Sequence, residues 1–162
     1  MAPGDSPEST VQGIPDTPTI RVIVVQTGRR SKFNIVERST WKDAIWSEHD
    51  STRHNLTLGG TDASGILRFK SEGFTPEFFL VALGMKKSLL ERWCDLKVDA
   101  KRDFTAASMH QNYHENNTPE SETKHEKKWE MRATSAMGTV VTVEYHDDQT
   151  PDNLRVVIIT IR

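Results

Sequence analysis

The chain has 162 residues, of which 35% are hydrophobic and 27% are charged, and its formal net charge is −2 at pH 7. The length favours one ordinary domain, and the near balance of charges excludes a broad basic surface for non-specific nucleic-acid binding. The single cysteine, Cys94, excludes an internal disulfide framework and a zinc site with several thiolates. No apolar run approaches the roughly 20 residues that span a bilayer. The composition therefore predicts a soluble globular protein.

Residues 1–18 differ in composition from the rest of the chain. They hold four of the seven prolines and three acidic residues, with no lysine or arginine. Such a segment buries too little apolar surface to offset its chain entropy, which predicts a disordered acidic leader. It also lacks the basic and apolar regions of a secretory signal. We therefore expect a cytoplasmic protein in which residues 19–162 form the folded domain.

Short segments rich in β-branched and apolar residues recur between turn residues along the chain. The strands expected from them cover 19–27, 33–37, 55–58, 66–70, 77–83, 139–145 and 154–161. A glycine-bounded loop over 59–65 separates two of these strands. This spacing of strands and turns predicts a β-sandwich or barrel rather than a β-α-β arrangement.

The middle of the chain interrupts this pattern with segments of helical character. The expected helices cover 85–93, 105–115 and 119–132. In the last of them, Thr118 can cap the helix and Pro119 suits its first position. Glu120 and Lys124 are four residues apart in the favourable order, which predicts a charged, solvated helix face.

A few residues could carry chemistry. His110 and His114 are four apart on a predicted helix, and Glu115 adds an oxygen ligand, but no third ligand follows at a zinc-site spacing. We therefore interpret the two histidines as polar residues of a half-exposed helix. Cys94 lies beside Asp95, whose negative charge would raise a thiol pKa, so a small buried hydrophobic role is expected. No paired carboxylates or nucleophile triad can be assembled, and we expect no enzymatic activity, metal or cofactor.

Several segments, taken in chain order, resemble the fungal fruit-body lectin family. They are TIRV (19–22), VER (36–38) with WK (41–42), LTLGG (56–60), SGILRF (64–69), RWCD (92–95) and DNL (152–154). The resemblance covers 19–161. It implies a mainly β fold, a sandwich of two sheets joined by a helix-loop-helix and similar to the actinoporin pore-forming toxins.

The resemblance also implies a function. Members of the family are lectins that assemble as homotetramers and carry two sugar sites per subunit. One site takes the disaccharide galactosyl-β-1,3-N-acetylgalactosamine, the T-antigen, and the other takes N-acetylglucosamine. We therefore expect glycans and glycoproteins as partners, no nucleic acid, no membrane insertion, and a role in defence.

The first sugar site would lie near the glycine-bounded loop. The residues that the resemblance implies for it are Ala44, Thr61, Asp62, Lys86, Lys87 and Ser88. Thr61 stands where the family has a serine, so the hydroxyl is retained, whereas Asp62 replaces a glycine and adds a charge. The family's asparagine contact falls in a segment that is about two residues longer here, where a lysine or Ser88 could donate instead.

The second sugar site departs further from the family. The residues that the resemblance implies for it are Asp95, Leu96, Val98 and Trp129. Asp95 could accept paired hydrogen bonds from sugar hydroxyls. Val98 replaces a threonine, Trp129 replaces a tyrosine, and the family's arginine has no clear match near Thr118.

Two alternatives remain open. The likeness to pore-forming toxins allows a membrane-active protein, which would need an exposed aromatic cluster and an amphipathic N-terminal helix. The acidic, proline-rich leader argues against that helix. The other alternative is a metal-dependent hydrolase that uses His110 and His114, which would hold stoichiometric zinc.

Overall fold

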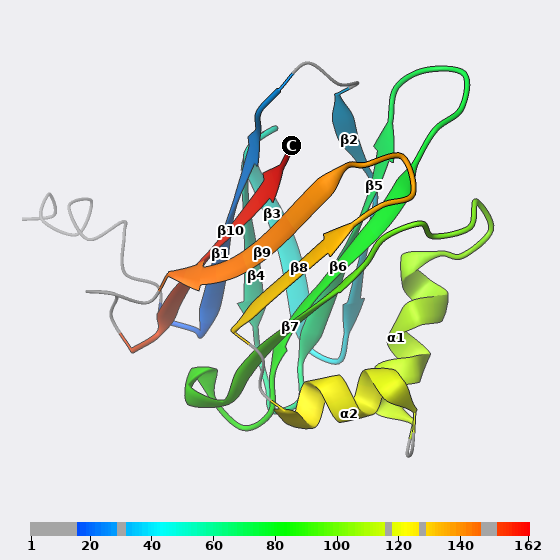
Figure 1. Ribbon diagram of the computed structural model, residues 1–162. Helices are drawn as coiled ribbons and strands as arrows, with labels where there is room; N and C mark the ends of the chain where they lie inside the picture. Colours follow the sequence, from blue (N-terminus) through cyan, green and yellow to red (C-terminus); the bar gives the residue numbers. More distant parts are fainter. Residues whose placement is uncertain (1–15, 29–31, 116–117, 127–128, 147–151) are drawn as a thin grey trace, which may run out of the picture.

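The strands of this protein form two sheets in a computed structural model that describes residues 16–28, 32–115, 118–126, 129–146 and 152–162. The first sheet contains β1 (Thr19–Gln26), β3 (Ala44–Asp50), β4 (Arg53–Leu58), β8 (Glu130–Thr134), β9 (Val140–His146) and β10 (Leu154–Ile161). The second contains β2 (Phe33–Trp41), β5 (Ser64–Ser71), β6 (Phe78–Met85) and β7 (Arg92–Lys97). The strand orders are β3-β4-β1-β10-β9-β8 and β2-β5-β6-β7. The predicted two-sheet, mainly β sandwich is confirmed (Figure 1).

The two ends of the described chain meet at the centre of the first sheet. β1 and β10 pair in parallel over their whole length, whereas the other strand pairs are antiparallel. Ile20, Val22 and Val24 of β1 are buried and alternate with more exposed residues. This period of two turns one face of the sheet toward the core and leaves the other face partly solvated.

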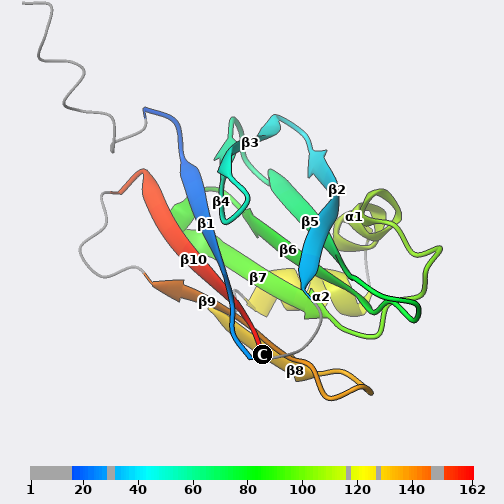
Figure 2. The same ribbon diagram turned by 90° about the horizontal axis from the view of Figure 1, so that it is seen from above.

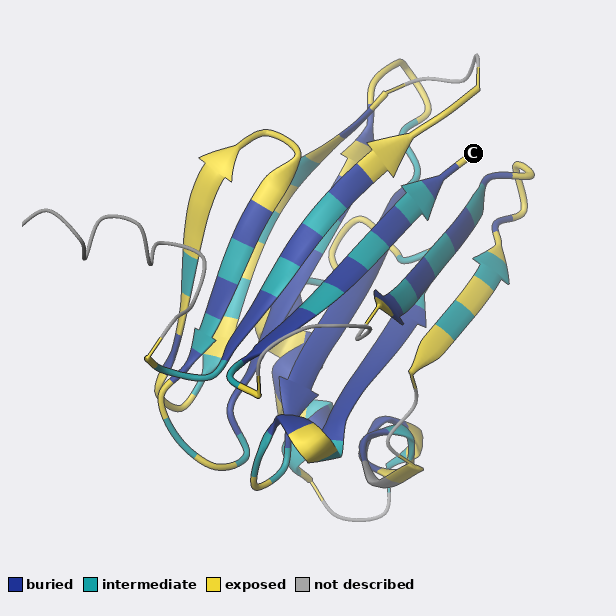
Figure 3. Cartoon of the chain, turned by 90° about the vertical axis from the view of Figure 1, so that its left-hand side faces the viewer, coloured by how far each residue is buried: buried dark blue, intermediate teal, exposed yellow. Residues whose placement is uncertain are grey.

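The second sheet is covered on both faces. All eight residues of β6 are buried, and Figure 3 shows β6 and β7 in nearly uniform dark blue behind the alternating colours of the first sheet. One face packs on the first sheet, and the other packs on Met109 and Tyr113 through Ile66, Leu80 and Trp93. A strand buried on both faces has a continuous apolar sequence, which is why the run at 77–83 predicts it well.

Two helices supply the cover on the outer face, as Figure 2 shows. Helix α1 (Ala106–His114) begins with a capping box, in which Thr105 accepts from the backbone of Ser108 and Ser108 bonds back. Helix α2 (Pro119–Glu126) begins after Thr118, whose hydroxyl accepts from the backbone N–H of Ser121 at 3.0 Å. The predicted helix-loop-helix connection is therefore confirmed.

Two expected helices and two strands differ from the sequence-based expectation. Residues 85–93 form only a short 3-10 turn, η2 (Leu89–Glu91), followed by β7. Trp93 and Cys94 pack into cores on opposite faces of the second sheet. A strand that is buried on both faces lacks the usual alternation of apolar and polar residues, so its sequence can resemble that of a helix. The helix expected over 119–132 ends at Glu126, and Glu130–Thr134 of the same segment pair with β9 as strand β8. Strand β3 was not expected, and β2 extends beyond 33–37 past a register shift between Ile35 and Glu37.

The predicted leader is described only in its last residues. Residues 1–15 lie outside the described part of the chain, so the division at residue 18 stays a prediction. Within the described part, the carbonyl of Pro18 accepts from the N–H of Leu58 at 2.8 Å, and the carbonyl of Thr17 accepts from the Thr19 hydroxyl at 2.8 Å.

Candidate functional site

The glycine-bounded loop is held at both of its ends. After β4, the N–H of Gly59 donates to the carbonyl of Asp43 in the β2–β3 turn at 2.7 Å. At the other end, the N–H of Asp62 donates to the carbonyl of Lys86, just after β6, and the N–H of Met85 donates to Ala63 at 3.2 Å. A Cβ on Gly59 would lie 2.7 Å from the Asp43 carbonyl oxygen. Only glycine therefore allows this close backbone approach.

Asp62 ties the same loop to the helices. Its φ of 61° lies in the left-handed region, where an aspartate is tolerated better than most residues. One carboxylate oxygen lies 3.1 Å from Nζ of Lys124 on α2, and the other lies 3.5 Å from Nδ1 of His114 on α1. The side chains of Lys124 and His114 are each only 8% exposed, compared with 35% for Asp62. The loop is thus anchored by a charge pair at the boundary between the helices and solvent.

His114 is neutral near pH 7. Burial, reinforced by the positive charge of Lys124, lowers its pKa to about 4. Its ring stacks on Trp41 of β2 with centroids 4.3 Å apart, and its Nε2 lies 3.4 Å from the hydroxyl of Ser64. Lys124, and not His114, therefore balances the charge of Asp62.

Ser64, His114 and Asp62 follow the order of contacts of a hydrolytic triad. The Ser64 residue is only 1% exposed, however, and its hydroxyl also lies 3.4 Å from Nδ1 of His110. A substrate carbonyl cannot reach a hydroxyl that is enclosed by the sheet and two imidazoles, so this arrangement is structural.

The two histidines of α1 lie on one face, as their spacing predicts. Their ring centroids are 6.4 Å apart, and burial lowers the pKa of His110 as well. Across the described part of the chain, no group of three or more His, Cys, Asp and Glu side chains is placed to hold a metal ion.

The structure brings several residues of the first predicted sugar site together. Ala44 begins β3 beside the loop, with its side chain buried, and Thr61 lies exposed at the loop tip. Asp62 follows it, and the backbone of Lys86 contacts Asp62 directly. Lys87 and Ser88 continue from there.

Ser88 already has a structural role. Its hydroxyl accepts from the N–H of Leu90 at 3.3 Å and thereby caps the 3-10 turn η2. Lys87 is exposed beside it. The Ser88 hydroxyl therefore already accepts one hydrogen bond, whereas Lys87 is exposed to solvent.

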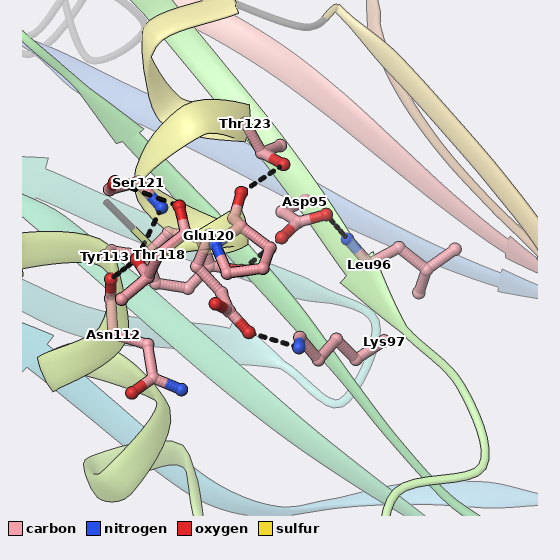
Figure 4. A network of polar contacts seen from close by, with 10 residues as sticks. Asp95, Leu96, Lys97, Asn112, Tyr113, Thr118, Glu120, Ser121 and Thr123 are labelled. Carbon is pink, nitrogen blue, oxygen red and sulfur yellow. Dashed lines mark hydrogen bonds and ion pairs between the residues drawn. The ribbon is translucent and has the colours of Figure 1, made fainter. Parts of the chain in front are cut away.

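The second predicted sugar site does not form one surface. Asp95 is buried under α2, where its two carboxylate oxygens accept from the Tyr113 hydroxyl at 2.5 Å and from the N–H of Leu96 at 2.8 Å (Figure 4). Burial raises the pKa of Asp95, although both hydrogen bonds oppose that rise. The side chains of Leu96 and Val98 pack into the core between the sheets instead. Neighbouring strand residues point to opposite faces, so of Asp95, Leu96 and Val98 only Asp95 faces the helices.

Trp129 lies apart from this aspartate. It is 60% exposed, and the guanidinium of Arg92 lies 4.4 Å from its ring centroid. The same guanidinium lies 5.4 Å from the ring of Tyr145 on β9. Arg92 thus sits between an exposed and a buried aromatic ring, a cation–π arrangement that the sequence analysis missed.

Glu120 and Lys124 do not lie on a solvated face of α2 as predicted, whereas Glu122 and Glu126 of the same helix are exposed. Glu120 and Lys124 are both buried, at 6% and 7% exposure, and they bond to different elements. Glu120 pairs with Lys97 of β7, as Figure 4 shows, and Lys124 pairs with Asp62. Their four-residue spacing was the available signal, but it could not indicate partners more than twenty residues away in the chain.

Comparisons with known proteins match this architecture. The sequence model of the fungal fruit body lectin family matches residues 17–158. The Boletus edulis lectin, from Boletus edulis, is 37% identical over 130 residues, which cover 78% of this chain and 86% of that protein. The crystal structure of wild-type Xerocomus chrysenteron lectin superposes with a TM-score of 0.79 at 33% identity, and the match covers 90% of this chain and 99% of that one. A variant of the same lectin with methionine substitutions gives the same TM-score and covers 98% of that chain.

Proposed function

Because the chain belongs to the fungal fruit body lectin family, a family of carbohydrate-binding proteins, we propose that it recognises glycans bearing galactosyl-β-1,3-N-acetylgalactosamine. The proposed site is the loop from Gly59 to Asp62 together with the start of β3 at Ala44. The observation that carries this proposal is the exposed Thr61 on a loop clamped from three sides. Sugar recognition needs hydroxyl and backbone groups in fixed positions.

The clamp explains how so short a loop can bind a polar ligand. Hydrogen bonds to Asp43 and Lys86 hold its backbone, and the charge pair of Asp62 and Lys124 holds one side chain. A loop that is already ordered loses little conformational entropy when a ligand binds. Because Lys124 balances Asp62, the site presents little net charge from this pair, which suits an uncharged disaccharide. The ammonium groups of Lys86 and Lys87 are our candidates for the contact that replaces the family's asparagine.

The second site receives less support. N-acetylglucosamine binding through Asp95 would require its carboxylate to leave Tyr113 and Leu96, and a buried donor left unpaired costs about 1–3 kcal/mol. Trp129 is the residue of this set whose ring is exposed and able to stack on a sugar face. We therefore propose that any N-acetylglucosamine contact in this region is made through Trp129.

Assembly and biological role follow from the same proposal. Single sugar sites are shallow and weak, and a homotetramer would gain strength by engaging several glycans at once. Cross-linking of glycoproteins on a foreign cell is the physical basis we propose for a defence role. The cytoplasmic location stays a prediction from the composition of residues 1–18.

Pore formation finds little support in the described part of the chain. None of its helices is long and apolar enough to cross a membrane. Its exposed large hydrophobic residues are distributed over strands, turns and loops, and Trp129 and Phe74 are the aromatic ones among them. Sugar-free liposomes that release an enclosed dye on addition of the protein would support this alternative instead.

A glycan array tests the proposal. The purified protein should bind glycans ending in galactosyl-β-1,3-N-acetylgalactosamine, and Thr61→Ala should weaken that binding about fivefold or more, as expected for one hydrogen bond. Thr134→Ala, an exposed threonine on β8, is the matched control and should bind as the wild type does. Failure of the intact protein to bind any glycan would contradict the proposal.

A further inference from the structure

The outward face of the first sheet carries an apolar stripe along its two central strands. The side chains that point away from the second sheet include Ile23 and Val25 of β1 and Val156 and Ile158 of β10. Val25 is 38% exposed, and the other three are partly exposed. The open face of an antiparallel sheet normally carries polar residues, so this stripe of β-branched apolar residues needs an explanation.

The rest of the described fold lies on the other side of this sheet. The alternate residues of β1 and β10 fill the core between the sheets, and the helices pack on the far face of the second sheet. Figure 3 shows the open face toward the viewer, with buried and partly exposed residues in turn along the central strands. In the part of the chain that the structure describes, no helix lies over the stripe.

Charges of opposite sign flank the stripe. On one side, Arg53 of β4 is the register partner of Ile23. On the other side, Glu144 of β9 is the register partner of Ile158. Because Ile23 and Ile158 are also partners of each other, one row crosses the sheet in the order Arg53, Ile23, Ile158, Glu144. Arg21, in the next outward row of β1, adds a second positive charge on the β4 side.

Other charged residues of this face lie at its two edges. Glu130 of β8 is the register partner of Glu144 and extends the acidic side, and Arg132 points outward two residues further along β8. At the opposite edge, Asp50 of β3 is the register partner of Arg53. The face therefore has a basic half and an acidic half, each with one charge of the other sign at its edge.

This pattern is complementary to itself about one particular axis. A twofold axis that runs parallel to β1 and β10, between these strands and above the face, places the β4 side of one copy on the β9 side of a second copy. Arg53 then faces Glu144 of the second copy at two equivalent points, and Asp50 faces both Glu130 and Arg132. A twofold axis across the strands would instead bring like charges together. Stacked sheets keep their strand directions within about 30° of each other, which both axes allow, so the charges select the first.

The size of the face is sufficient for a stable contact. Six strands of up to about eight residues form a face of about 24 by 23 Å, from the usual strand spacing and rise per residue. Two such faces amount to about 1,100 Å², which exceeds the roughly 1,000 Å² that a specific interface needs. An apolar centre with a charged rim is also the usual anatomy of such an interface.

We propose that the outward face of the first sheet is an interface between two copies of this chain, with Ile23 against Ile158 at its centre and Arg53 against Glu144 on both sides. The axis parallel to the strands keeps the same end of both copies together. The loop from Gly59 to Asp62 follows β4 at that end, so the two loops point in one direction. This consequence rests on the proposed lectin function, since a pair of sugar sites that face one glycan-bearing surface binds it more strongly than a single site does.

Charge reversal tests the interface through the mass of the assembly. Arg53→Glu places like charges opposite each other at two points of the contact, and Glu144→Arg does the same. Each substitution should raise the dissociation constant of this contact about 100-fold or more, and so lower the mass measured by sedimentation at micromolar concentration. Lys101→Glu and Glu122→Arg, at exposed positions outside the face, are the matched controls and should keep the wild-type mass.

A mixture of the two single variants gives the sharpest result. In a mixed pair of Arg53→Glu with Glu144→Arg, one rim contact has both charges reversed and the other is that of the wild type, so both contacts are attractive. An equimolar mixture should therefore regain the wild-type mass, with the two variants in equal numbers in native mass spectrometry. A monomeric wild type, single variants that keep the wild-type mass, or a mixture that stays dissociated would each overturn the proposal.

Both variants should fold. Arg53 is exposed, and Glu144 contacts the exposed His146 at 3.5 Å, so neither charge reversal affects the core. If one of them does not fold, the wild type decides. In an equal mixture of isotope-labelled and unlabelled protein, an NOE between the methyl groups of Ile23 in one copy and Ile158 in the other is expected, and its absence would overturn the proposal.

Glycan binding separates this inference from the proposed function. A folded but dissociated variant should bind the free disaccharide as the wild type does, and should bind a glycan-coated surface about 100-fold more weakly. Equal binding of the coated surface by the wild type and the dissociated variant would overturn the arrangement with both loops at one end. A wild type that binds no glycan would contradict the proposed function, and the masses would still decide whether the interface exists.

Discussion

Two aspartates, each implied in a sugar site, have opposite surroundings. Asp62 is about one-third exposed on a clamped loop, and its charge is balanced by Lys124 at 3.1 Å. Asp95 lies on a strand that α2 covers, and both of its oxygens are occupied by Tyr113 and by the N–H of Leu96. The first position leaves neighbouring hydroxyl and backbone groups open to a ligand, whereas the second is part of the packing between the sheet and the helices.

The comparison shows what makes a polar residue available for binding. A carboxylate whose hydrogen bonds are already formed in the folded protein stabilises that fold, and a ligand must replace those bonds before it gains anything. A site built on an ordered loop avoids that penalty because its open groups are beside the anchored ones.

We expect the largest effect from Asp95→Ala. The substitution leaves the buried Tyr113 hydroxyl and the N–H of Leu96 without an acceptor, and should lower the free energy of unfolding by about 2–3 kcal/mol. Urea denaturation measures this decrease in the free energy of unfolding. Tyr113→Phe, which removes one of the two bonds, should cost about 1 kcal/mol. Unchanged stability together with lost N-acetylglucosamine binding would show that Asp95 is a ligand-binding residue after all.

A smaller effect on stability is expected from Gly59→Ala. The new Cβ would meet the Asp43 carbonyl oxygen at 2.7 Å, so the loop must shift, at a cost of about 1–3 kcal/mol. Gly60→Ala is the matched control, since its Cβ would meet only a side-chain oxygen of Asp43 at 3.3 Å. Thermal unfolding and glycan binding should both separate the two variants. Equal behaviour of the pair would mean that the clamp at Gly59 does not order the site.

The link between the loop and α2 is expected to be weaker still. A double-mutant cycle of Asp62→Asn and Lys124→Met should give a coupling of about 0.5–1 kcal/mol in stability, because Asp62 is partly exposed and screened. The coupling should decrease at high salt. Glycan affinity measured on the wild type, the two single variants and the double variant shows whether this pair also positions Thr61. Independent, additive effects on affinity would indicate that the loop is ordered by its backbone bonds alone.

Substitution of His114 should have the smallest effect on stability at neutral pH, and the effect should appear only at acidic pH. Its pKa of about 4 lies below the ordinary value of 6.5, so between these values the unfolded chain binds the additional proton. The stabilising contribution is therefore complete above pH 6.5 and is lost as the pH falls toward 4. His114→Asn should give a shallower decrease in melting temperature over this range.

Asp95 provides an internal contrast in the same experiment. Its pKa is raised, so the folded state binds its proton more readily and Asp95 opposes the loss of stability as the pH falls. The difference between wild type and His114→Asn isolates the histidine from that opposing contribution. An identical pH profile for the two proteins would contradict a neutral, buried His114.

Much of the fold can be predicted from local sequence. The β-branched residues of β1 and β10, the continuous apolar run of β6 and the cap at Thr105 each encode their structure within about ten residues. Strands β3, β7 and β8 cannot be recognised in this way. β3 and β8 are edge strands with polar or irregular sequences, and β7 is buried on two different cores, so their conformation depends on partner strands.

The sequence by itself determined the class of this protein: a mainly β sandwich with helices in the middle of the chain and the segments of a lectin family. It also placed Ala44, Thr61 and Asp62 in one candidate site. Only the tertiary structure decided that Asp62 forms an ion pair with Lys124, that Asp95 accepts a hydrogen bond from Tyr113 and that His54 lines a cavity. The physical reason is that strand and helix patterns are local, whereas burial, ion pairing and the satisfaction of hydrogen bonds depend on groups far apart in the chain.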